Sequence, residues 1–155
     1  MDRLDLFRFT PFRLNRLAAE VSAALASEYR ERYGLDVPEW RVLATLGARD
    51  APCTAQYISH CTRTHKSTIS RAVTSLMKRK LIARIAHEND GRAFAIGFTA
   101  KGRALYDELV PHLLRKDRDI MSCLTADQRK QFAAALTTIE KSLELVQTAE
   151  GPEPY

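Results

Sequence analysis

Residues 65–81 concentrate side chains that can donate hydrogen bonds to a polyanion. The apolar residues of this stretch recur at the spacing i, i+3, i+4, i+7, which predicts a helix that buries Ile69, Ala72, Val73, Leu76 and Met77. The opposite face carries only polar or cationic side chains, with no carboxylate: Lys66, Ser67, Ser70, Arg71, Thr74, Ser75 and Lys78. Hydroxyls and Lys/Arg donate to phosphate oxygens, and Arg and Lys also bind guanine edges. This face suits a nucleic acid, and an ordinary solvated helix is the competing interpretation.

The residues just before this stretch predict a second helix that packs against it. Thr54 can cap a short helix that buries Ile58 and Cys61. Residues 62–64 are too few for anything but a turn, and they lead directly into the basic helix. A helix, a short turn and a second helix with a basic outer face form a helix-turn-helix.

After Leu81 the apolar period changes from helical to two, which predicts two strands. The alternating residues are Ile82, Arg84 and Ala86, then Phe94, Ile96 and Phe98. Residues 87–92 contain Asn-Asp-Gly, the turn chemistry of a hairpin. A hairpin after a recognition helix is a wing, and Asn89 and Arg92 at its tip could contact DNA, with Arg92 in a minor groove. A salt bridge from Arg92 to Glu88 or Asp90 is the alternative.

Long helices are predicted on both sides of these motifs. One runs over residues 10–33, enters through Pro11 and ends at Gly34, after an apolar arm whose side chains require a partner surface: Leu4, Leu6, Phe7, Phe9 and Phe12. A capping box of Asp36 and Glu39 then starts a helix that should end at Gly47.

Two further helices are expected in the C-terminal third. The first starts at Thr99 and reaches about Cys123, with a kink or break at Pro111. The second opens with a capping box at Thr125 and extends to about Thr148. Its apolar residues follow a heptad spacing that indicates a packed helix pair, within or between subunits: Phe132, Leu136, Ile139, Leu143 and Val146.

Charge is distributed unevenly along the 155 residues, whose net charge is +5. Residues 59–103 hold ten Lys/Arg and two carboxylates, against fourteen and seventeen in the rest of the chain. A basic segment on a slightly acidic body is typical of nucleic-acid binding, with a membrane surface as the weaker alternative. No apolar run reaches the ~20 residues of a membrane span, and the N-terminus does not resemble a signal peptide. Three widely spaced cysteines favour a reducing compartment, so we expect a cytoplasmic protein.

Three segments in this order resemble the MarR family of bacterial winged-helix regulators. They are GLDVPEWRVLATL at residues 34–46, HKSTISRAVTSLMKRKLI at 65–82 and NDGRAFAIGFTAKGRAL at 89–105. The resemblance covers nearly the whole chain and implies a homodimer formed by N- and C-terminal helices. It implies that the second helix of the motif enters successive major grooves and that Arg92 enters the flanking minor groove. Many members release DNA when a small phenolic or carboxylate ligand binds.

The resemblance also assigns roles to individual positions. The recognition-helix contacts are Lys66, Ser67, Thr68, Ser70 and Arg71, although Thr68 could instead bond to a backbone carbonyl. We add Thr54, Ser75, Asn89 and Arg92 as candidate DNA contacts. Asp90 matches the residue that holds the wing in shape by pairing with an arginine. Lys80 stands where most relatives have glycine, which predicts a less sharply turned helix end.

The sequence gives weaker support for redox, metal-binding and effector-binding roles. The redox-active relatives place their cysteine in the first helix, whereas Cys53, Cys61 and Cys123 lie elsewhere, so buried inert thiols are expected. His60, Cys61 and His65 do not share a helical face, and no metal or cofactor is expected. Arg13, Asn15, Arg16, Trp40 and His112 are candidates for an effector pocket, with surface charges and a core tryptophan as the alternative.

The sequence thus predicts a mostly α protein with a small β-hairpin wing. Its expected parts are an N-terminal dimerisation arm and helix (1–35), a DNA-binding lobe (36–98), C-terminal dimerisation helices (99–150) and a tail (151–155). The expected function is sequence-specific binding of double-stranded DNA at a pseudo-palindromic operator, as a repressor released by a small effector. The alternatives are an effector-independent DNA-binding protein and a winged-helix protein-protein adaptor. An enzyme is disfavoured because the sequence has no nucleophile-base pair in a motif and no phosphate-binding glycine loop.

Overall fold

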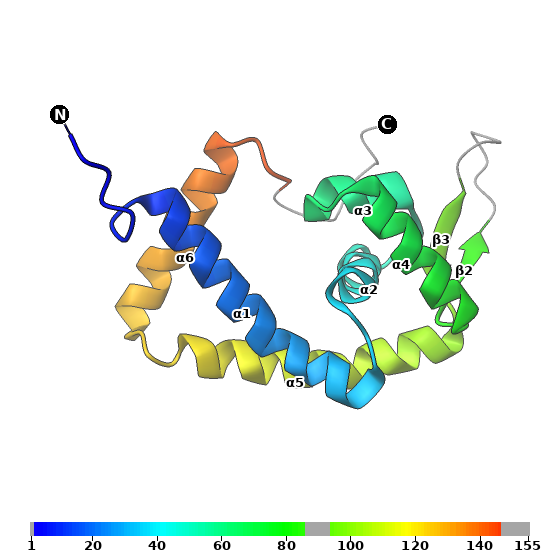
Figure 1. Cartoon of the computed structure of the whole chain (residues 1–155). Helices are drawn as coiled ribbons and strands as arrows, with labels where there is room; N and C mark the ends of the chain where they lie inside the picture. The colour runs from blue at the N-terminus through cyan, green and yellow to red at the C-terminus, as the bar shows by residue number, and fades with distance from the viewer. Residues whose placement is uncertain (1, 86–93, 147–155) are drawn as a thin grey trace.

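The computed structural model describes residues 2–85 and 94–146 of the chain. Within these ranges it has α1 (Thr10–Tyr33), α2 (Val37–Arg49), β1 (Cys53–Thr54), α3 (Ala55–Thr62), α4 (Lys66–Lys78), β2 (Ile82–Ile85), β3 (Ala95–Phe98), α5 (Ala100–Met121) and α6 (Ala126–Ser142). The predicted fold class, mostly helical with a small sheet, is confirmed. Figure 1 shows α2, α3, α4 and the strands grouped together, a unit that we call the lobe, while α1, α5 and α6 extend beyond it. None of the described helices is both long enough and apolar enough to cross a membrane.

Local capping signals account for most of the helix boundaries. Gly34 ends α1 with a φ of 62°, the left-handed conformation that glycine adopts without strain. The predicted capping box of α2 is present, because the Asp36 carboxylate accepts from the N–H of Glu39 and the Glu39 carboxylate accepts from the N–H of Asp36. A threonine hydroxyl caps each of α3, α5 and α6 by accepting from the N–H three residues later: Thr54, Thr99 and Thr125.

The core lies within the lobe and where α1 and α5 pack against it. In α4 the predicted buried face is confirmed for its four central positions: Ile69, Ala72, Val73 and Leu76. Ile58 of α3 and Leu43 of α2 are fully buried beside them, and Leu109 of α5 closes the same cluster. By contrast, α6 contributes no buried residue. The lobe is therefore well packed together with parts of α1 and α5, whereas α6 presents its apolar face to solvent.

Two predicted helix ends are wrong, and one of the two outcomes expected at Pro111, a break in the helix, does not occur. The helix α2 continues past Gly47 to Arg49, because Gly47 serves close packing and not termination: a Cβ there would overlap the ring of Tyr106. The helix α5 runs unbroken through Pro111. Proline has no N–H to donate to the carbonyl four residues earlier, but Pro111 is exposed, so water can donate to that carbonyl instead. The helix α6 ends at Ser142, short of residue 148, because Glu144 adopts a left-handed φ of 56° and closes the helix end.

The sheet has three strands where the sequence predicted two. Besides the hairpin pair of β2 and β3, with Ile82 opposite Phe98, the short strand β1 pairs antiparallel with β3, with Cys53 opposite Ile96. Two residues are too few to show an alternating pattern, so β1 could not be recognised. The pairing anchors the start of α3 to the base of the wing. The predicted turn, residues 87–92, lies outside the described residues.

The end of α4 turns as sharply as a glycine would allow, although Lys80 occupies the position. Lys80 has a φ of 58°. The N–H of Leu81 donates to the carbonyl of Leu76 (3.0 Å), and the N–H of Lys80 donates to that of Met77 (2.9 Å), the two bonds of a Schellman motif. The expectation of a less sharp helix end is therefore wrong. A side chain in the left-handed region costs roughly 1 kcal/mol relative to glycine.

Replacing Lys80 with glycine should stabilise the protein by about 1 kcal/mol, because it removes this strain. The gain should appear as a rise of a few degrees in the melting temperature, measured by circular dichroism. Lys80→Ala is the control, since it removes the charge but keeps a Cβ at positive φ. An equal gain from both variants would mean that charge, and not backbone conformation, limits stability here.

Candidate nucleic-acid interface

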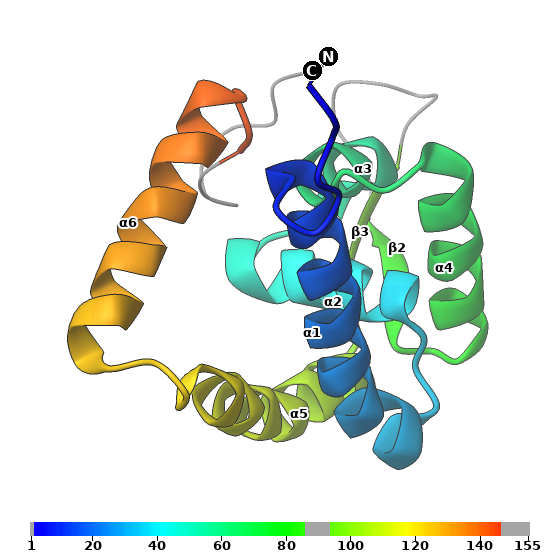
Figure 2. The same cartoon turned by 60° about the vertical axis from the view of Figure 1, so that its left-hand side comes forward.

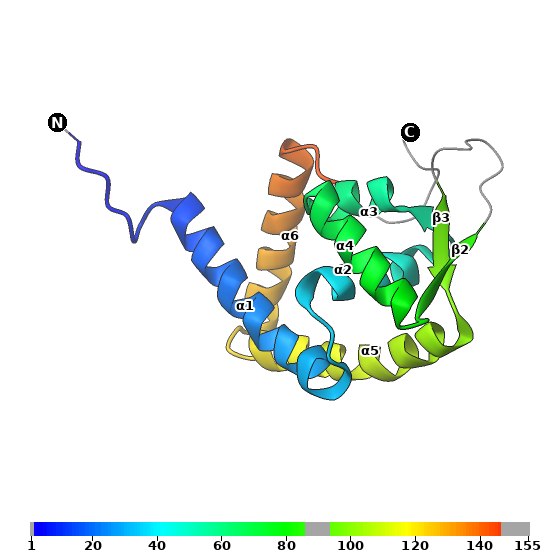
Figure 3. The same cartoon turned by 45° about the vertical axis from the view of Figure 1, so that its right-hand side comes forward.

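The exposed face of α4 lies on the surface of the lobe beside β2 and β3 (Figure 3). Six of the seven side chains predicted for this face are exposed: Lys66, Ser67, Ser70, Arg71, Thr74 and Lys78. No carboxylate occurs between residues 66 and 78. The helix therefore presents cations and hydroxyls to solvent over its full length of 13 residues, about 20 Å.

Polar contacts near the N-terminus of α4 hold several of these side chains against the helix. The Nδ1 of His65 accepts from the N–H of Ser67 (3.2 Å) and lies 2.8 Å from the Ser67 hydroxyl, so a histidine caps the helix. Arg71 donates through Nη2 to the hydroxyl of Thr68, a long contact of 3.5 Å. The Arg71 side chain is therefore weakly held and can turn toward a ligand.

Ser75 and Thr54 are placed differently from the sequence prediction. Ser75 is half-buried, and its hydroxyl donates to the Oε1 of Glu39 (2.5 Å) inside the lobe. Its assignment to the exposed face is wrong, because the carboxylate of Glu39 draws the hydroxyl inward. Thr54 is also half-buried, and its hydroxyl caps α3 by accepting from the N–H of Tyr57 (3.1 Å).

The turn of the helix-turn-helix is fixed by hydrogen bonds to Thr64, which is buried. The hydroxyl of Ser59 donates to the Thr64 carbonyl (2.6 Å), and Arg41 of α2 donates through Nη1 to the Thr64 hydroxyl (3.0 Å). Arg63 takes the left-handed conformation that reverses the chain after α3. These contacts set the angle at which α4 leaves α3.

Only the base of the wing falls within the described residues. There the guanidinium of Arg84 on β2 lies 3.7 Å from the centroid of the Phe94 ring, a cation-π contact that joins the two sides of the hairpin. Asn89, Asp90 and Arg92, the predicted wing residues, lie outside the described part of the chain.

Two residues help to orient α4 in ways that the sequence did not predict. Glu39, only 5% exposed, accepts from both Asp36 and Ser75. Arg79 donates to the carbonyls of Tyr33 and Gly34 at the end of α1 (2.6 and 3.3 Å). The sequence contained a signal for Glu39 as a helix cap but none for its link to Ser75. Arg79 lies in a run of three cations and resembles its exposed neighbours Lys78 and Lys80 in sequence.

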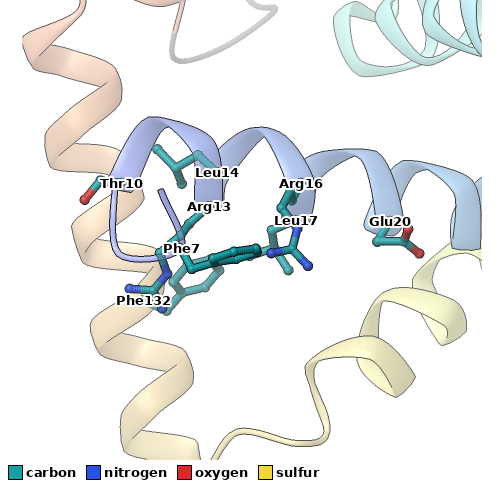
Figure 4. Close-up of a pocket in the computed structure, with 8 residues that line it drawn as sticks. All are labelled: Phe7, Thr10, Arg13, Leu14, Arg16, Leu17, Glu20 and Phe132. Atoms are coloured by element: carbon teal, nitrogen blue, oxygen red, sulfur yellow. The ribbon is translucent and has the colours of Figure 1, made fainter. Parts of the chain in front are cut away.

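The five residues predicted for an effector pocket do not come together. Arg13 and Arg16 line an open pocket of about 520 Å³ at the start of α1, together with Phe7 and with Phe132 of α6 (Figure 4). The Arg16 guanidinium lies 5.4 Å from the Phe7 ring centroid. Asn15 is exposed and is not among the lining residues of this pocket.

Trp40 and His112 have other partners. The Trp40 ring is stacked between Tyr29 (5.8 Å between centroids) and Tyr106 (6.2 Å), so it belongs to the core, as the alternative interpretation held. Burial raises the pKa of both tyrosines above the ordinary 10.0, because the charged phenolate is disfavoured away from water. The Nδ1 of His112 lies 2.6 Å from the Nη2 of Arg115, three residues later in α5.

No disulfide joins the three cysteines, which differ in exposure. Cys53 is buried and Cys61 half-buried, whereas Cys123 is exposed, which corrects the expectation that all three are buried. Across residues 2–85 and 94–146, no three His, Cys, Asp or Glu side chains are grouped as metal ligands would be.

Comparison with known proteins assigns the chain to a family. The model of the MarR family matches residues 33–93, which include the helix-turn-helix. The part of the chain that carries the helix-turn-helix therefore belongs to the MarR family. The regulator PecS of Dickeya dadantii is 28% identical over 132 residues, which cover 84% of this chain and 79% of PecS.

Solved structures of MarR-family regulators have the same fold. A MarR/EmrR family regulator from Acinetobacter sp. ADP1 superposes with a TM-score of 0.80 at 23% identity, covering 91% of this chain and 99% of that one. A MarR-family regulator from Silicibacter pomeroyi gives 0.77 at 25% identity, covering 94% and 99%. The family consists of transcriptional regulators that bind DNA. The protein is accordingly a DNA-binding transcriptional regulator with a winged helix, and not an enzyme.

Proposed function

We propose that the protein is a homodimeric, sequence-specific repressor that acts in the cytoplasm on a pseudo-palindromic operator. The observation that carries this proposal is the exposed, carboxylate-free face of α4. In the proposed complex α4 enters the major groove, with Lys66, Ser67, Thr68, Ser70 and Arg71 as its contacts. Thr54, Asn89 and Arg92 remain predicted contacts, and Asp90 the predicted wing-structuring residue. Ser75 leaves this set because it bonds to Glu39.

The exposed apolar side chains outside the lobe support the homodimer. On α6 the predicted heptad face is open to solvent: Leu136 is 36% exposed, Ile139 45% and Leu143 65%. The N-terminal arm adds Leu4 and Phe7, which are 69% and 68% exposed, and α1 adds Leu17, which is 53% exposed. Two such surfaces on one chain account for dimerisation through residues 1–35 and 99–150, with residues 36–98 as the DNA-binding lobe. Two lobes would then bind half-sites about 10 bp apart.

Repression is supported by a named relative. The transcriptional repressor Rv2887 of Mycobacterium tuberculosis is 29% identical over 120 residues, covering 77% of this chain and 82% of Rv2887. Among proteins of the same fold, MepR of S. aureus has been solved with DNA, at a TM-score of 0.74 and 22% identity.

A small aromatic effector, phenolic or carboxylate, is proposed to release the DNA. BpsR of Bordetella bronchiseptica, with a TM-score of 0.79 and 20% identity, is a regulator whose DNA binding responds to 6-hydroxynicotinic acid. In this chain, Arg13 and Arg16 beside Phe7 and Phe132 supply cations and aromatic rings that would suit an aromatic anion.

Selection of bound sequences from a random DNA pool, at two salt concentrations, tests the function. Enrichment of one pseudo-palindrome, with affinity that falls steeply as salt rises, is the expected result. Failure to enrich any motif, together with no binding at low salt, would overturn the proposal and favour a protein-binding role.

On the selected operator, Arg71→Ala should weaken binding by about 1–3 kcal/mol and relax selectivity at one base position. The reason is that Arg71 is exposed and held only by a 3.5 Å contact, so it is free to bind a base edge. Binding to single-base variants of the operator, measured by fluorescence anisotropy, checks this. Lys141→Ala removes the same charge from α6, outside the recognition helix, and should change little. Unaltered selectivity in Arg71→Ala would show that Arg71 does not read a base.

A further inference from the structure

The orientation of α4 depends on polar contacts as well as on its buried face. Apolar contacts are not directional, so the buried face alone allows α4 to tilt against the lobe. Directional bonds are concentrated at the C-terminal end of the helix. Ser75 bonds to Glu39, Arg79 bonds to the end of α1, and the carbonyl of Arg79 accepts from Lys101 of α5 (3.3 Å).

Arg79 makes the most direct of these connections. Its guanidinium donates from Nη2 to the Tyr33 carbonyl (2.6 Å) and from Nη1 to the Gly34 carbonyl (3.3 Å). Carbonyls at a helix C-terminus lack partners within the helix and carry the negative end of its dipole, which strengthens bonds from a cation. The planar fork of arginine fixes both direction and distance. One side chain thereby joins the end of the recognition helix to the end of α1.

Glu39 provides a second link to α4, from the start of α2. The buried carboxylate accepts from the N–H of Asp36 (2.9 Å) and from the hydroxyl of Ser75 (2.5 Å). Only residues 34–36 separate α1 from α2. The C-terminal end of α4 is therefore bonded on both sides of this short connection. Arg79 bonds to Tyr33 and Gly34 before it, and Ser75 bonds to Glu39 after it.

A small change of angle at this contact would produce a larger displacement at the other end of α4, where the proposed DNA contacts lie. The 13 residues of α4 span about 20 Å, so a tilt of about 10° around Arg79 displaces the N-terminal end by about 3.5 Å. That distance is close to the rise of one base pair, about 3.4 Å. A tilt of this size around Arg79 would therefore move Lys66 by about one base step, and Arg71, which lies closer to Arg79, by about 2 Å.

We propose that Arg79 is a positioning residue that fixes the angle between the recognition helix and α1, and thereby sets the half-site spacing that the dimer accepts. This inference rests on the proposed function, because spacing has meaning only for a dimer on a two-part operator. Arg79 acts through α4 and does not itself contact DNA.

The test measures affinity for the selected operator and for versions with one base pair added or removed between the half-sites. The wild type should prefer the selected spacing. Arg79→Ala should reduce that preference by about tenfold, with helix content and dimer mass unchanged. Arg79→Lys keeps the charge but cannot donate to both carbonyls in fixed geometry. Its preference for the selected spacing should therefore lie between those of the wild type and Arg79→Ala. Should Arg79→Ala be too unstable to purify, Arg79→Lys carries the test.

Lys78→Ala is the matched control, because Lys78 is exposed, carries the same charge and precedes Arg79 by one residue. It should weaken all spacings equally. If Arg79→Ala or Arg79→Lys also lowers affinity equally at every spacing, the positioning role is refuted. A wild-type protein that selects no two-part operator would overturn the proposed function, and this inference with it, and the wild-type data alone would reveal that outcome.

Discussion

A chain carrying Leu136→Asp and Ile139→Asp should bind its operator at least about 100-fold more weakly than the wild type. Both side chains lie on the exposed apolar face of α6, where no residue is buried within the chain. Figure 2 shows α6 standing apart from the lobe. In the proposed dimer this face is covered by the partner subunit, and two buried, unpaired carboxylates per subunit would prevent association. A monomer has one lobe and loses the second half-site, which otherwise binds at high effective concentration. Sedimentation velocity and anisotropy on the same samples measure both effects.

The control for this experiment places the same two charges on the opposite side of α6. Ala134→Asp with Thr137→Asp adds two carboxylates to exposed positions about half a turn away from the apolar face. This variant should remain dimeric and bind DNA nearly as well as the wild type. Equal weakening by both pairs would point to charge repulsion from DNA, and a dimeric Leu136→Asp, Ile139→Asp variant would exclude α6 as the dimer surface.

Elements whose boundaries are set by neighbouring residues could be predicted from the sequence. The starts of α2, α3, α5 and α6 each depend on one side chain that bonds to a backbone N–H three residues later, as at Asp36 and Thr54. The buried face of α4 was predictable for a similar reason, because helical spacing alone decides which residues share a face. Both features are determined within about one turn of the chain.

Features that depend on distant residues could not be predicted. Gly47 allows the close approach of Tyr106, and Ser75 turns inward because Glu39 lies beside it. Arg79 and Lys78 are adjacent and similar in charge, yet one bonds to α1 and the other is exposed. The same holds for the predicted effector residues: Arg13 and Arg16 line one pocket, whereas Trp40 stacks between two tyrosines and His112 lies beside Arg115. Spacing along one helix therefore predicts most of the side chains that share a face, whereas no sequence signal shows which side chains of several helices meet.

Gly102 is the position where a single added carbon should destabilise the described part of the fold most. It lies buried in the first turn of α5, and a Cβ there would overlap the backbone carbonyl of Leu81. That carbonyl already accepts from the N–H of Thr99 (3.1 Å) and from its hydroxyl (3.2 Å), the bonds that start α5 against β2. Backbone atoms cannot move aside as a flexible side chain can. Gly102→Ala must therefore separate α5 from the lobe.

We expect Gly102→Ala to cost about 3 kcal/mol, from overpacking together with weakened hydrogen bonds at Leu81. The melting temperature of a chain of this size should fall by about 10 °C.

Gly34→Ala is the matched control, because it is the same residue change at a position where the cause of destabilisation is different. Gly34 has a φ of 62° and no atom within 4 Å of an added Cβ, so alanine meets only backbone strain of about 1 kcal/mol. Thermal unfolding of both variants should place Gly102→Ala well below Gly34→Ala. The reverse order would mean that the α5–β2 junction can adjust, and that the end of α1 is the less tolerant of the two sites.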